Sequence, residues 1–175
     1  MNRLLQRIHQ HDLQLLLWLD MSFLGNRTTT ARLASRTGDG WLQLLLPLTL
    51  WWLEPASGGP FCLLVAVAFC CERPLYLLLK NSCQRRRPPE AIPSFRSVIR
   101  ASDRFSFPSG HTMAAFLLAT LATLHYGLPA LPLFLWAALV GLSRVELGVH
   151  FPSDVIAGAL LGPAIALVTY TAMIS

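Results

Sequence analysis

The sequence contains almost no lysine and little acidic charge. Lys80 is the only lysine, so the formal net charge of +5 over 175 residues comes almost entirely from arginine. Guanidinium groups make planar, forked contacts with phosphate, which favours phosphorylated ligands or lipid headgroups as partners. Aromatic side chains do not alternate with the basic ones, so nucleic acid is not expected as a partner.

Cysteines are also few and irregularly placed. Cys62, Cys70 and Cys71 lie in an apolar segment, and Cys83 lies in a polar one. This spacing predicts neither a disulfide framework nor a zinc site, and it leaves the redox compartment open. The N-terminus has no small-residue cleavage site, so we do not expect a signal peptide.

Charged residues are scarce compared with hydrophobic ones, at 13% against 54%, a balance unusual for a soluble protein of this size. A membrane-spanning helix needs about 20 mostly apolar residues. Such segments lie at 59–80, 111–127, 129–147 and 153–174, and a further span is predicted at 39–57, where tryptophans would anchor both ends. A soluble helical core is the alternative interpretation.

The N-terminal part has a different pattern. Residues 13–24 are rich in leucine but short, and they include Asp20, so we expect an amphipathic helix at the membrane surface. The predicted fold class is therefore all-α: an integral membrane helical bundle with five to six transmembrane helices and an N-terminal amphipathic helix. The predicted division is an interfacial segment at 1–38 and a membrane-embedded domain at 39–175.

The order of the spans predicts which loops share a membrane face. If 59–80 leaves the bilayer on one side, 111–127 returns from that side, 129–147 comes back to it and 153–174 leaves it again. The long polar stretch 81–108 and the short connection 147–153 should therefore lie on the same face.

Three groups of polar residues belong to that face. They are Lys80 with Arg87, then Ser109, Gly110 and His111, and finally Ser143, Arg144, His150 and Asp154. A transferring phosphoryl group spreads negative charge over its oxygens, which fixed cations such as Lys80, Arg87 and Arg144 can stabilise. The unpaired N–H groups that open the 111–127 helix form an anion site, where Ser109 adds a hydroxyl and Gly110 permits close approach.

Two histidines supply reactive groups. His150 and Asp154 are four residues apart, so the carboxylate can reach one imidazole nitrogen and leave the other free to attack phosphorus. His111 can protonate the leaving oxygen, because imidazole exchanges protons readily near neutral pH. This pattern predicts a nucleophile, an orienting carboxylate and a general acid.

Each group also has a simpler interpretation. The basic residues could form a headgroup-facing loop, Ser109 could be a helix cap, and His150 with Asp154 could be a local hydrogen-bonded pair. Their joint occurrence on one predicted face favours a single site.

Four other charged residues lie near these groups. Glu72 and Arg73 interrupt an apolar segment, and we expect polar contacts inside the bundle there, with a functional role as the alternative. Glu146 and Asp103 are expected to hold the arginines of the site in place.

The spacing of these residues resembles a known family. Residues 80–88 read K-x6-R-P, residues 108–111 read P-S-G-H, and residues 143–154 read S-R-x5-H-x3-D. In order and without substitution, these are similar to the three motifs of the type 2 phosphatidic acid phosphatase family, and the similarity extends over about residues 39–172.

The resemblance assigns roles to individual residues. It implies that His150 forms a phosphohistidine intermediate, that His111 is the general acid and that Asp154 orients His150. It also implies that Lys80, Ser109, Gly110, Arg87 and Arg144 hold the phosphate, that Ser143 has a supporting role, and that no metal or other cofactor is needed.

The predicted function is a metal-independent lipid phosphatase. By resemblance its substrate is polyprenyl diphosphate, phosphatidylglycerophosphate or phosphatidate, and a non-catalytic lipid-binding or scaffolding membrane protein is the alternative. The apolar spans disfavour the related vanadium haloperoxidases and soluble acid phosphatases. We expect a bacterial cytoplasmic (inner) membrane location. The linkers opposite the site lack Lys and Arg, which favours a cytoplasmic site, whereas the resemblance favours an outward one, so both faces stay open.

Overall fold

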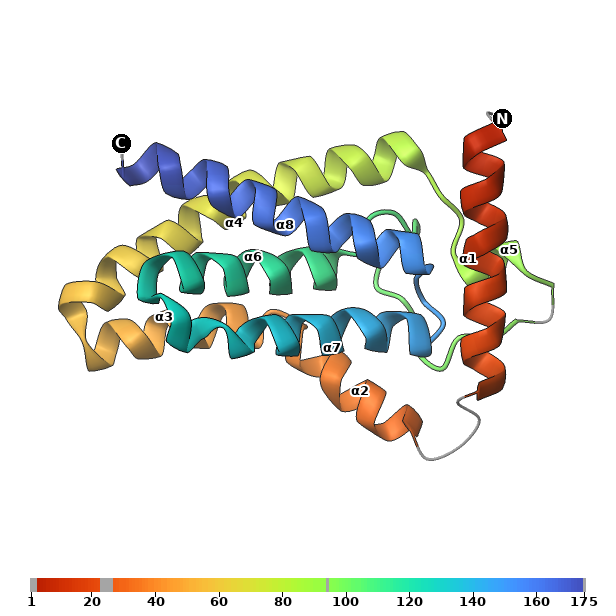
Figure 1. Ribbon diagram of the computed structural model, residues 1–175, viewed down its shortest axis with the longest axis horizontal. Helices are drawn as coiled ribbons and strands as arrows, with labels where there is room; N and C mark the ends of the chain where they lie inside the picture. Colours follow the sequence, from red (N-terminus) through yellow and green to blue (C-terminus); the bar gives the residue numbers. More distant parts are fainter. Residues whose placement is uncertain (1–2, 23–26, 94, 175) are drawn as a thin grey trace.

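The computed structural model describes residues 3–22, 27–93 and 95–174, which form helices and loops with no strand among them. The helices are α1 (Arg3–Ser22), α2 (Arg27–Thr37), α3 (Trp41–Leu53), α4 (Pro55–Cys83), α5 (Pro88–Ala91), α6 (Gly110–Tyr126), the 3-10 helix η1 (Leu128–Ala130), α7 (Pro132–Glu146) and α8 (Pro152–Ile174) (Figure 1). The predicted all-α class is confirmed. Residues 1–2 and 23–26 of the predicted N-terminal segment lie outside the described residues.

Helix α6 forms the centre of the bundle. Side chains on every side of it are buried, including Met113, Leu117, Leu118 and Leu121. A helix that is apolar all round belongs in the interior of a bundle, and α6 packs there against α4 and α8. The residue that opens α6, Gly110, is thereby fixed at one end of the core.

Two glycines let α8 approach α6 closely. A Cβ atom at Gly158 would lie 2.7 Å from the carbonyl oxygen of Ser109, and one at Gly162 would lie 2.4 Å from that of Met113. Small residues four positions apart are a common device for close helix packing in membranes. Because the backbone N–H of Ser109 also donates to the carbonyl of Asp154 at 3.0 Å, the start of α6 is tied to the start of α8.

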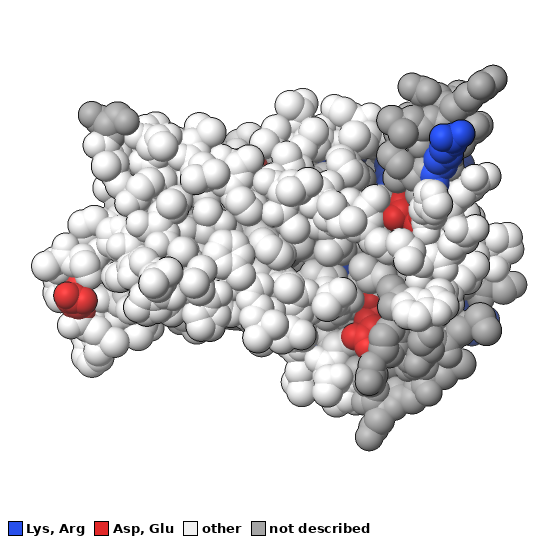
Figure 2. Space-filling view, in the orientation of Figure 1, with Lys and Arg blue, Asp and Glu red and all other residues white. Residues whose placement is uncertain are grey.

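Within the described residues, three segments are long and apolar enough to cross a membrane, namely Pro55–Ala91, Leu128–Glu146 and Pro152–Ile174, and α3 is a shorter apolar helix. Large apolar side chains on their outer surfaces are exposed, among them Leu63, Leu78, Leu135 and Leu160. Figure 2 shows charged side chains mainly at the end of the molecule that carries α1, with an uncharged surface over most of the remaining length. These features are those of a bundle with an apolar belt.

The boundaries of two predicted segments differ from the structure. Helix α4 begins at Pro55 instead of residue 59, because a proline is well accommodated in the first turn of a helix. Helix α1 begins at Arg3, well before residue 13, and lies across the end of the bundle (Figure 1). Its Leu16 is buried with Val145 and Phe151, whereas Trp18 is exposed.

Helix α2 was not predicted, because its sequence is polar and lacks an apolar stripe. Tertiary packing stabilises it instead: Ala31 is buried in a small cluster with Leu147 and Val149. This arrangement places the end of α2 beside the connection between α7 and α8.

The loops predicted to share one face do meet. The N–H of Val98, in the long polar stretch, donates to the carbonyl oxygen of Leu147 at 3.0 Å. Both connections lie at the end of the bundle that α1 crosses (Figure 1). The crossing argument therefore gave the correct arrangement.

Candidate active site

His150 lies in the short connection between α7 and α8. The backbone N–H groups of Val149 and His150 both donate to the carbonyl oxygen of Arg144, which folds the connection back over the end of α7. Gly148 has a φ of 71°, and a Cβ there would lie 2.8 Å from the ring of Phe95, so glycine suits this turn. The His150 side chain is only 2% exposed.

The environment of His150 favours a neutral ring. Burial lowers the pKa of His150 to about 4, an effect that the Asp154 carboxylate opposes and the Arg87 guanidinium reinforces. Nε2 lies 3.5 Å from Nη1 of Arg87, on the side of the cationic residues. A neutral imidazole at pH 7 has a lone pair available for attack on an electrophile.

Asp154 is close to His150, but the predicted hydrogen bond is not formed in this structure. Oδ2 of Asp154 lies 3.7 Å from Nδ1 of His150, and it accepts instead from the backbone N–H of Phe151 at 2.8 Å. The other oxygen, Oδ1, accepts from Nη1 of Arg85 at 2.6 Å. The carboxylate is thus held behind the imidazole, with its lone pairs committed to other donors.

Arg85 connects this carboxylate to helix α1. Its Nη2 donates to Asp12 at 2.5 Å, and Asp12 also accepts from the backbone and side chain of Ser153 at 2.9 and 2.5 Å. Asp12 is 3% exposed and Asp154 is fully buried. One guanidinium therefore bridges two buried carboxylates, which is the forked geometry that arginine provides.

The two cations of the first motif share one carboxylate. Lys80 Nζ donates to Asp103 at 2.8 Å and to the hydroxyl of Tyr76 at 2.6 Å, and the Arg87 guanidinium forms an ion pair with the same Asp103. The Tyr76 hydroxyl also donates to Asp103, at 2.5 Å. Burial alone would raise the pKa of Asp103, but the hydrogen bonds from Lys80 and Tyr76 lower it well below its ordinary value. Asp103 thus holds Arg87, as we expected.

Arg144 reaches the same region from α7. Nη1 donates to the hydroxyl of Ser35 in α2 at 2.5 Å, whereas the buried Nε has no hydrogen-bond partner among the residues that the structure describes. The residue is only 4% exposed. A buried guanidinium with an unpaired donor is costly, and an anion in the adjacent space would satisfy it.

The start of α6 contributes His111 and Gly110. His111 Nε2 donates to Oδ1 of Asp39, in the link between α2 and α3, at 2.8 Å. Ser109 occupies the N-cap position without capping the backbone, and its hydroxyl bonds that of Thr112 at 2.9 Å. Ser109 and Asp154 are completely buried.

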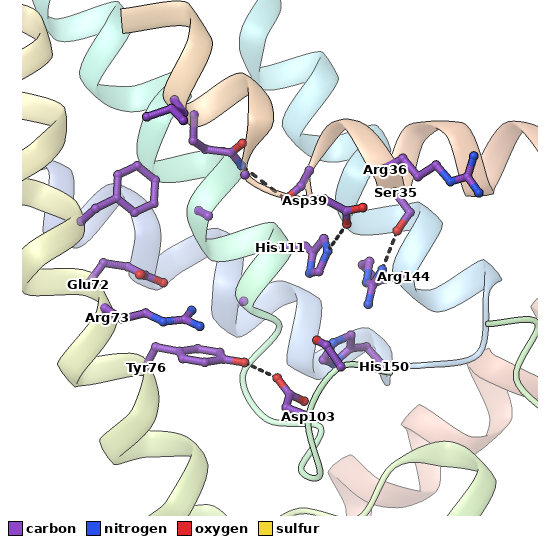
Figure 3. A pocket seen from close by; sticks show the side chains of 18 of the residues that line it. Ser35, Arg36, Asp39, Glu72, Arg73, Tyr76, Asp103, His111, Arg144 and His150 are labelled. Carbon is purple, nitrogen blue, oxygen red and sulfur yellow. Dashed lines mark hydrogen bonds and ion pairs between the residues drawn. The ribbon is translucent and has the colours of Figure 1, made fainter. Parts of the chain in front are cut away.

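These groups surround a cavity of about 1280 Å³. Of the predicted site residues, Arg87, Gly110, His111, Arg144 and His150 line it, while Lys80, Ser109 and Asp154 lie behind its wall. Figure 3 shows His111, Arg144 and His150 directed toward a common space, with Tyr76 and Asp103 across from them. The cavity continues between α3 and α4, where Leu44, Leu48, Val65 and Phe69 line it.

Sequence reasoning missed several contributors. Asp12, Ser35, Asp39 and Arg85 were given no role, and nothing in their local sequence marks them. In the described part of the chain, Glu146 forms no side-chain ion pair, unlike Asp103, and no group of three or more His, Cys, Asp or Glu side chains is arranged to hold a metal ion.

The chain is similar to known proteins over most of its length. The chain is 33% identical over 131 residues to the bacitracin transport permease protein BcrC of Bacillus licheniformis, covering 73% of this chain but only 63% of BcrC, which is less than two thirds of that protein's length. It is 36% identical over 145 residues to decaprenylphosphoryl-5-phosphoribose phosphatase of Mycobacterium tuberculosis, covering 79% of this chain and 76% of that protein.

Solved structures extend the agreement to the fold. The crystal structure of LpxE from Aquifex aeolicus matches with a TM-score of 0.77 and 27% identity, covering 91% of this chain and 94% of that one. Residues 58–174 match the PAP2 superfamily. With the three motifs in place at one end of a helical bundle, the chain belongs to the PAP2 superfamily, as its sequence predicted.

Proposed function

We propose that the protein is a lipid phosphatase that hydrolyses a phosphate monoester or diphosphate of a membrane lipid through a phosphohistidine intermediate, without a metal ion. The observation that carries this proposal is the cavity wall itself. Two imidazoles, His111 and His150, and two guanidinium groups, Arg87 and Arg144, line one cavity that continues into an apolar space between α3 and α4. The polar end fits a phosphate and the apolar end fits a lipid tail.

The proposed chemistry uses a neutral His150 and a protonated His111. Neutral His150 attacks phosphorus through Nε2, the bond from phosphorus to the leaving oxygen breaks, and His111 gives that oxygen a proton. Arg87, Arg144 and Lys80 stabilise the charge on the phosphoryl oxygens, together with N–H groups at the start of α6. In the second step His111 removes a proton from water, the water oxygen bonds phosphorus, the bond to His150 breaks and inorganic phosphate leaves.

The supporting residues have positioning roles in this scheme. Asp154 stabilises the positive charge that His150 acquires when it carries the phosphoryl group, because its carboxylate lies 3.7 Å from Nδ1. Ser109 remains a predicted phosphate ligand, and its hydroxyl would have to turn away from Thr112 to serve as one.

The relatives suggest substrates and a location. The Mycobacterium tuberculosis relative is named for a decaprenylphosphoryl-linked phosphoribose, and polyprenyl diphosphate, phosphatidylglycerophosphate and phosphatidate remain our candidates. We place the protein in a bacterial cytoplasmic membrane with five to six spans. The 39–175 phosphatase domain would be embedded, and the 1–38 segment would lie at the interface, where α1 crosses the end of the bundle (Figure 1).

A phosphate-release assay on the purified protein in detergent tests the proposal. The wild type should release phosphate from at least one of these lipids in the presence of a chelator, and vanadate should inhibit it. The variant His150→Ala should lose turnover, whereas His11→Ala, which removes an exposed imidazole on α1, should keep it. Rapid quenching should trap phosphate on His150.

Two outcomes would contradict the proposal. Near-normal turnover by His150→Ala would exclude the nucleophilic role, and loss of wild-type activity with chelator would exclude a metal-free reaction. Lipid phosphate binding without any turnover would instead favour the non-catalytic lipid-binding protein.

A further inference from the structure

Helix α4 places another cation beside the phosphate-binding residues. Arg73 lies seven residues before Lys80, which is close to two helical turns, so both are on the same side of α4. The Arg73 guanidinium carbon is 4.8 Å from the ring centre of Tyr76, and Lys80 Nζ is 4.4 Å from the centre of the same ring. Figure 3 shows Arg73 pointing from α4 into the cavity that His150 also lines.

No carboxylate among the described residues lies within ion-pair distance of the Arg73 guanidinium. Arg73 is exposed and makes no hydrogen bond or ion pair with them. Glu72 precedes it and lines the same cavity, but no ion pair joins the two side chains (Figure 3). Of the polar contacts that we expected for these two residues, the structure shows a mutual attraction of the two charges and the contact of Arg73 with the Tyr76 ring, without an ion pair.

An unpaired guanidinium is unexpected at this position. Arg73 lies inside Pro55–Ala91, a segment apolar enough to span a membrane, and ionisable groups at that depth are costly unless they meet water, an anion or a ligand. Among the cations nearest His150, Lys80 and Arg87 share Asp103, and Arg144 donates to Ser35. Arg32, Arg36 and Arg100 also line the cavity, from α2 and the 81–108 stretch, whereas Arg73 is the cation that α4 presents to it. Arg73 is therefore available to a group that the protein does not supply.

The position of Arg73 in the cavity identifies that group. The reacting phosphate belongs beside His150, and the lipid tail belongs in the apolar space between α3 and α4. Arg73 lies between these two regions, because the cavity lining along α4 runs from Tyr76 through Arg73 to Phe69 and Val65. A ligand group at Arg73 would accordingly be the part of the substrate that joins its terminal phosphate to its tail.

We propose that Arg73 binds a second phosphoryl group of the substrate, located between the reacting phosphate and the lipid tail. This proposal rests on the proposed phosphatase function and narrows its substrate class to lipids that carry two phosphoryl groups. A guanidinium can engage two oxygens of such a group at once. A lipid monophosphate has no group to place there and gains nothing from Arg73.

The test compares lipids that carry two phosphoryl groups with lipids that have the same tail and one phosphoryl group. Farnesyl diphosphate is paired with farnesyl phosphate, and dihexanoyl phosphatidylglycerophosphate is paired with dihexanoyl phosphatidate. Binding is measured by calorimetry in detergent with His150→Ala, which leaves the ligands intact. Adding Arg73→Gln should weaken binding of a two-phosphoryl lipid by about 10- to 100-fold and leave its monophosphate partner little changed.

Two further variants serve as controls. Arg86→Gln makes the same change of charge at an exposed position outside the cavity and should alter neither affinity. Arg73→Lys keeps the charge but loses the forked guanidinium, so its loss of affinity for the two-phosphoryl lipid should be intermediate. It would replace Arg73→Gln if that variant failed to fold.

Every outcome of the binding experiment either supports or contradicts the proposed role of Arg73. A loss confined to the diphosphate, or confined to the phosphatidylglycerophosphate, supports it and reports the spacing between the two phosphoryl groups. Equal losses for both members of a pair, or no loss, would overturn it. If the wild type bound these lipids with Arg73-dependent selectivity but released no phosphate from any of them, the phosphatase function would fail while the subsite remained.

Discussion

Arg85 gives the most specific prediction about the interior of the site, because it touches neither the cavity nor the reacting atoms. Its guanidinium bridges Asp154, which is fully buried, and Asp12, which is 3% exposed. In the variant Arg85→Gln both carboxylates would lose their cation. Asp154 would then favour its protonated form, and a neutral carboxyl group would no longer stabilise a charged His150.

The magnitude follows from the bonds that are lost. A hydrogen bond to a charged group contributes about 1.5–3 kcal/mol. If the lost hydrogen bond to Asp154 had stabilised mainly the transition state, kcat should decrease by about 10- to 100-fold, because each 1.36 kcal/mol changes the rate tenfold. The kcat of Arg85→Lys should lie between those of the wild type and Arg85→Gln, since one ammonium group cannot reproduce the fork that reaches both carboxylates.

The assay is steady-state phosphate release with Arg86→Gln as the matched control. Arg86 is the next residue and is exposed, and its side chain makes no hydrogen bond or ion pair in the described part of the chain. Its removal should leave kcat unchanged. If Arg85→Gln folded with a normal melting temperature and kept the kcat of Arg86→Gln, the inferred positioning of Asp154 would be wrong.

Three other expectations follow. Because the pKa of His150 is lowered to about 4 and protonation occupies its attacking nitrogen, kcat/KM should not fall between pH 7 and about 5 and should fall only below that. An ordinary imidazole, with a pKa of about 6.5, would already lose roughly 20-fold at pH 5, and a pH profile distinguishes the two. Asp39→Asn, which replaces the charged acceptor of His111 Nε2 by a neutral amide and so disfavours a protonated His111, should slow a lipid monophosphate more than p-nitrophenyl phosphate, whose leaving group needs no acid; equal slowing would argue against a general acid. Gly162→Ala would bring a Cβ within 2.4 Å of the Met113 carbonyl oxygen and should destabilise the bundle by about 1–3 kcal/mol, measured as a lower melting temperature in detergent.

The central part of the site was predictable because two independent patterns agree. Hydropathy fixed the order of the crossings, and the crossings placed the 81–108 stretch and the 147–153 connection together. Motif spacing then selected Arg87, His111, Arg144 and His150, all of which line one cavity. Neither pattern depends on side-chain packing, so both can be read from the chain alone.

The N-terminal contributors could not be found in this way. Ser35 belongs to none of the three motifs, and it contacts Arg144, which lies 109 positions away in the sequence. Helix α2 has no apolar periodicity, and its position depends on packing against the end of α7. The predicted boundary at residue 38 also separated Asp12 and Ser35 from the groups that they contact. Such contacts depend on tertiary packing, which propensity and patterning do not determine.

Three consecutive arginines show most clearly what could not be predicted from the sequence. Arg85, Arg86 and Arg87 are the same residue type in a polar stretch, yet the first bridges two buried carboxylates, the second is exposed and the third lines the cavity. The motif singled out Arg87, and no local property distinguishes the other two. After α4 ends at Cys83 the chain is irregular, so successive side chains point in unrelated directions that only the fold determines.

Asp103 connects the electrostatics of the site to its selectivity. It places one negative charge on Lys80 and Arg87, which keeps two neighbouring cations from repelling each other. A phosphodiester or fatty-acid carboxylate that displaced it would exchange one negative charge for another and gain little. A terminal phosphate carries between one and two negative charges at pH 7, so its exchange with Asp103 strengthens the attraction to the same donors. We therefore expect the carboxylate to favour terminal phosphates over the singly charged headgroups of the surrounding membrane, because only the former improve on the contacts already made.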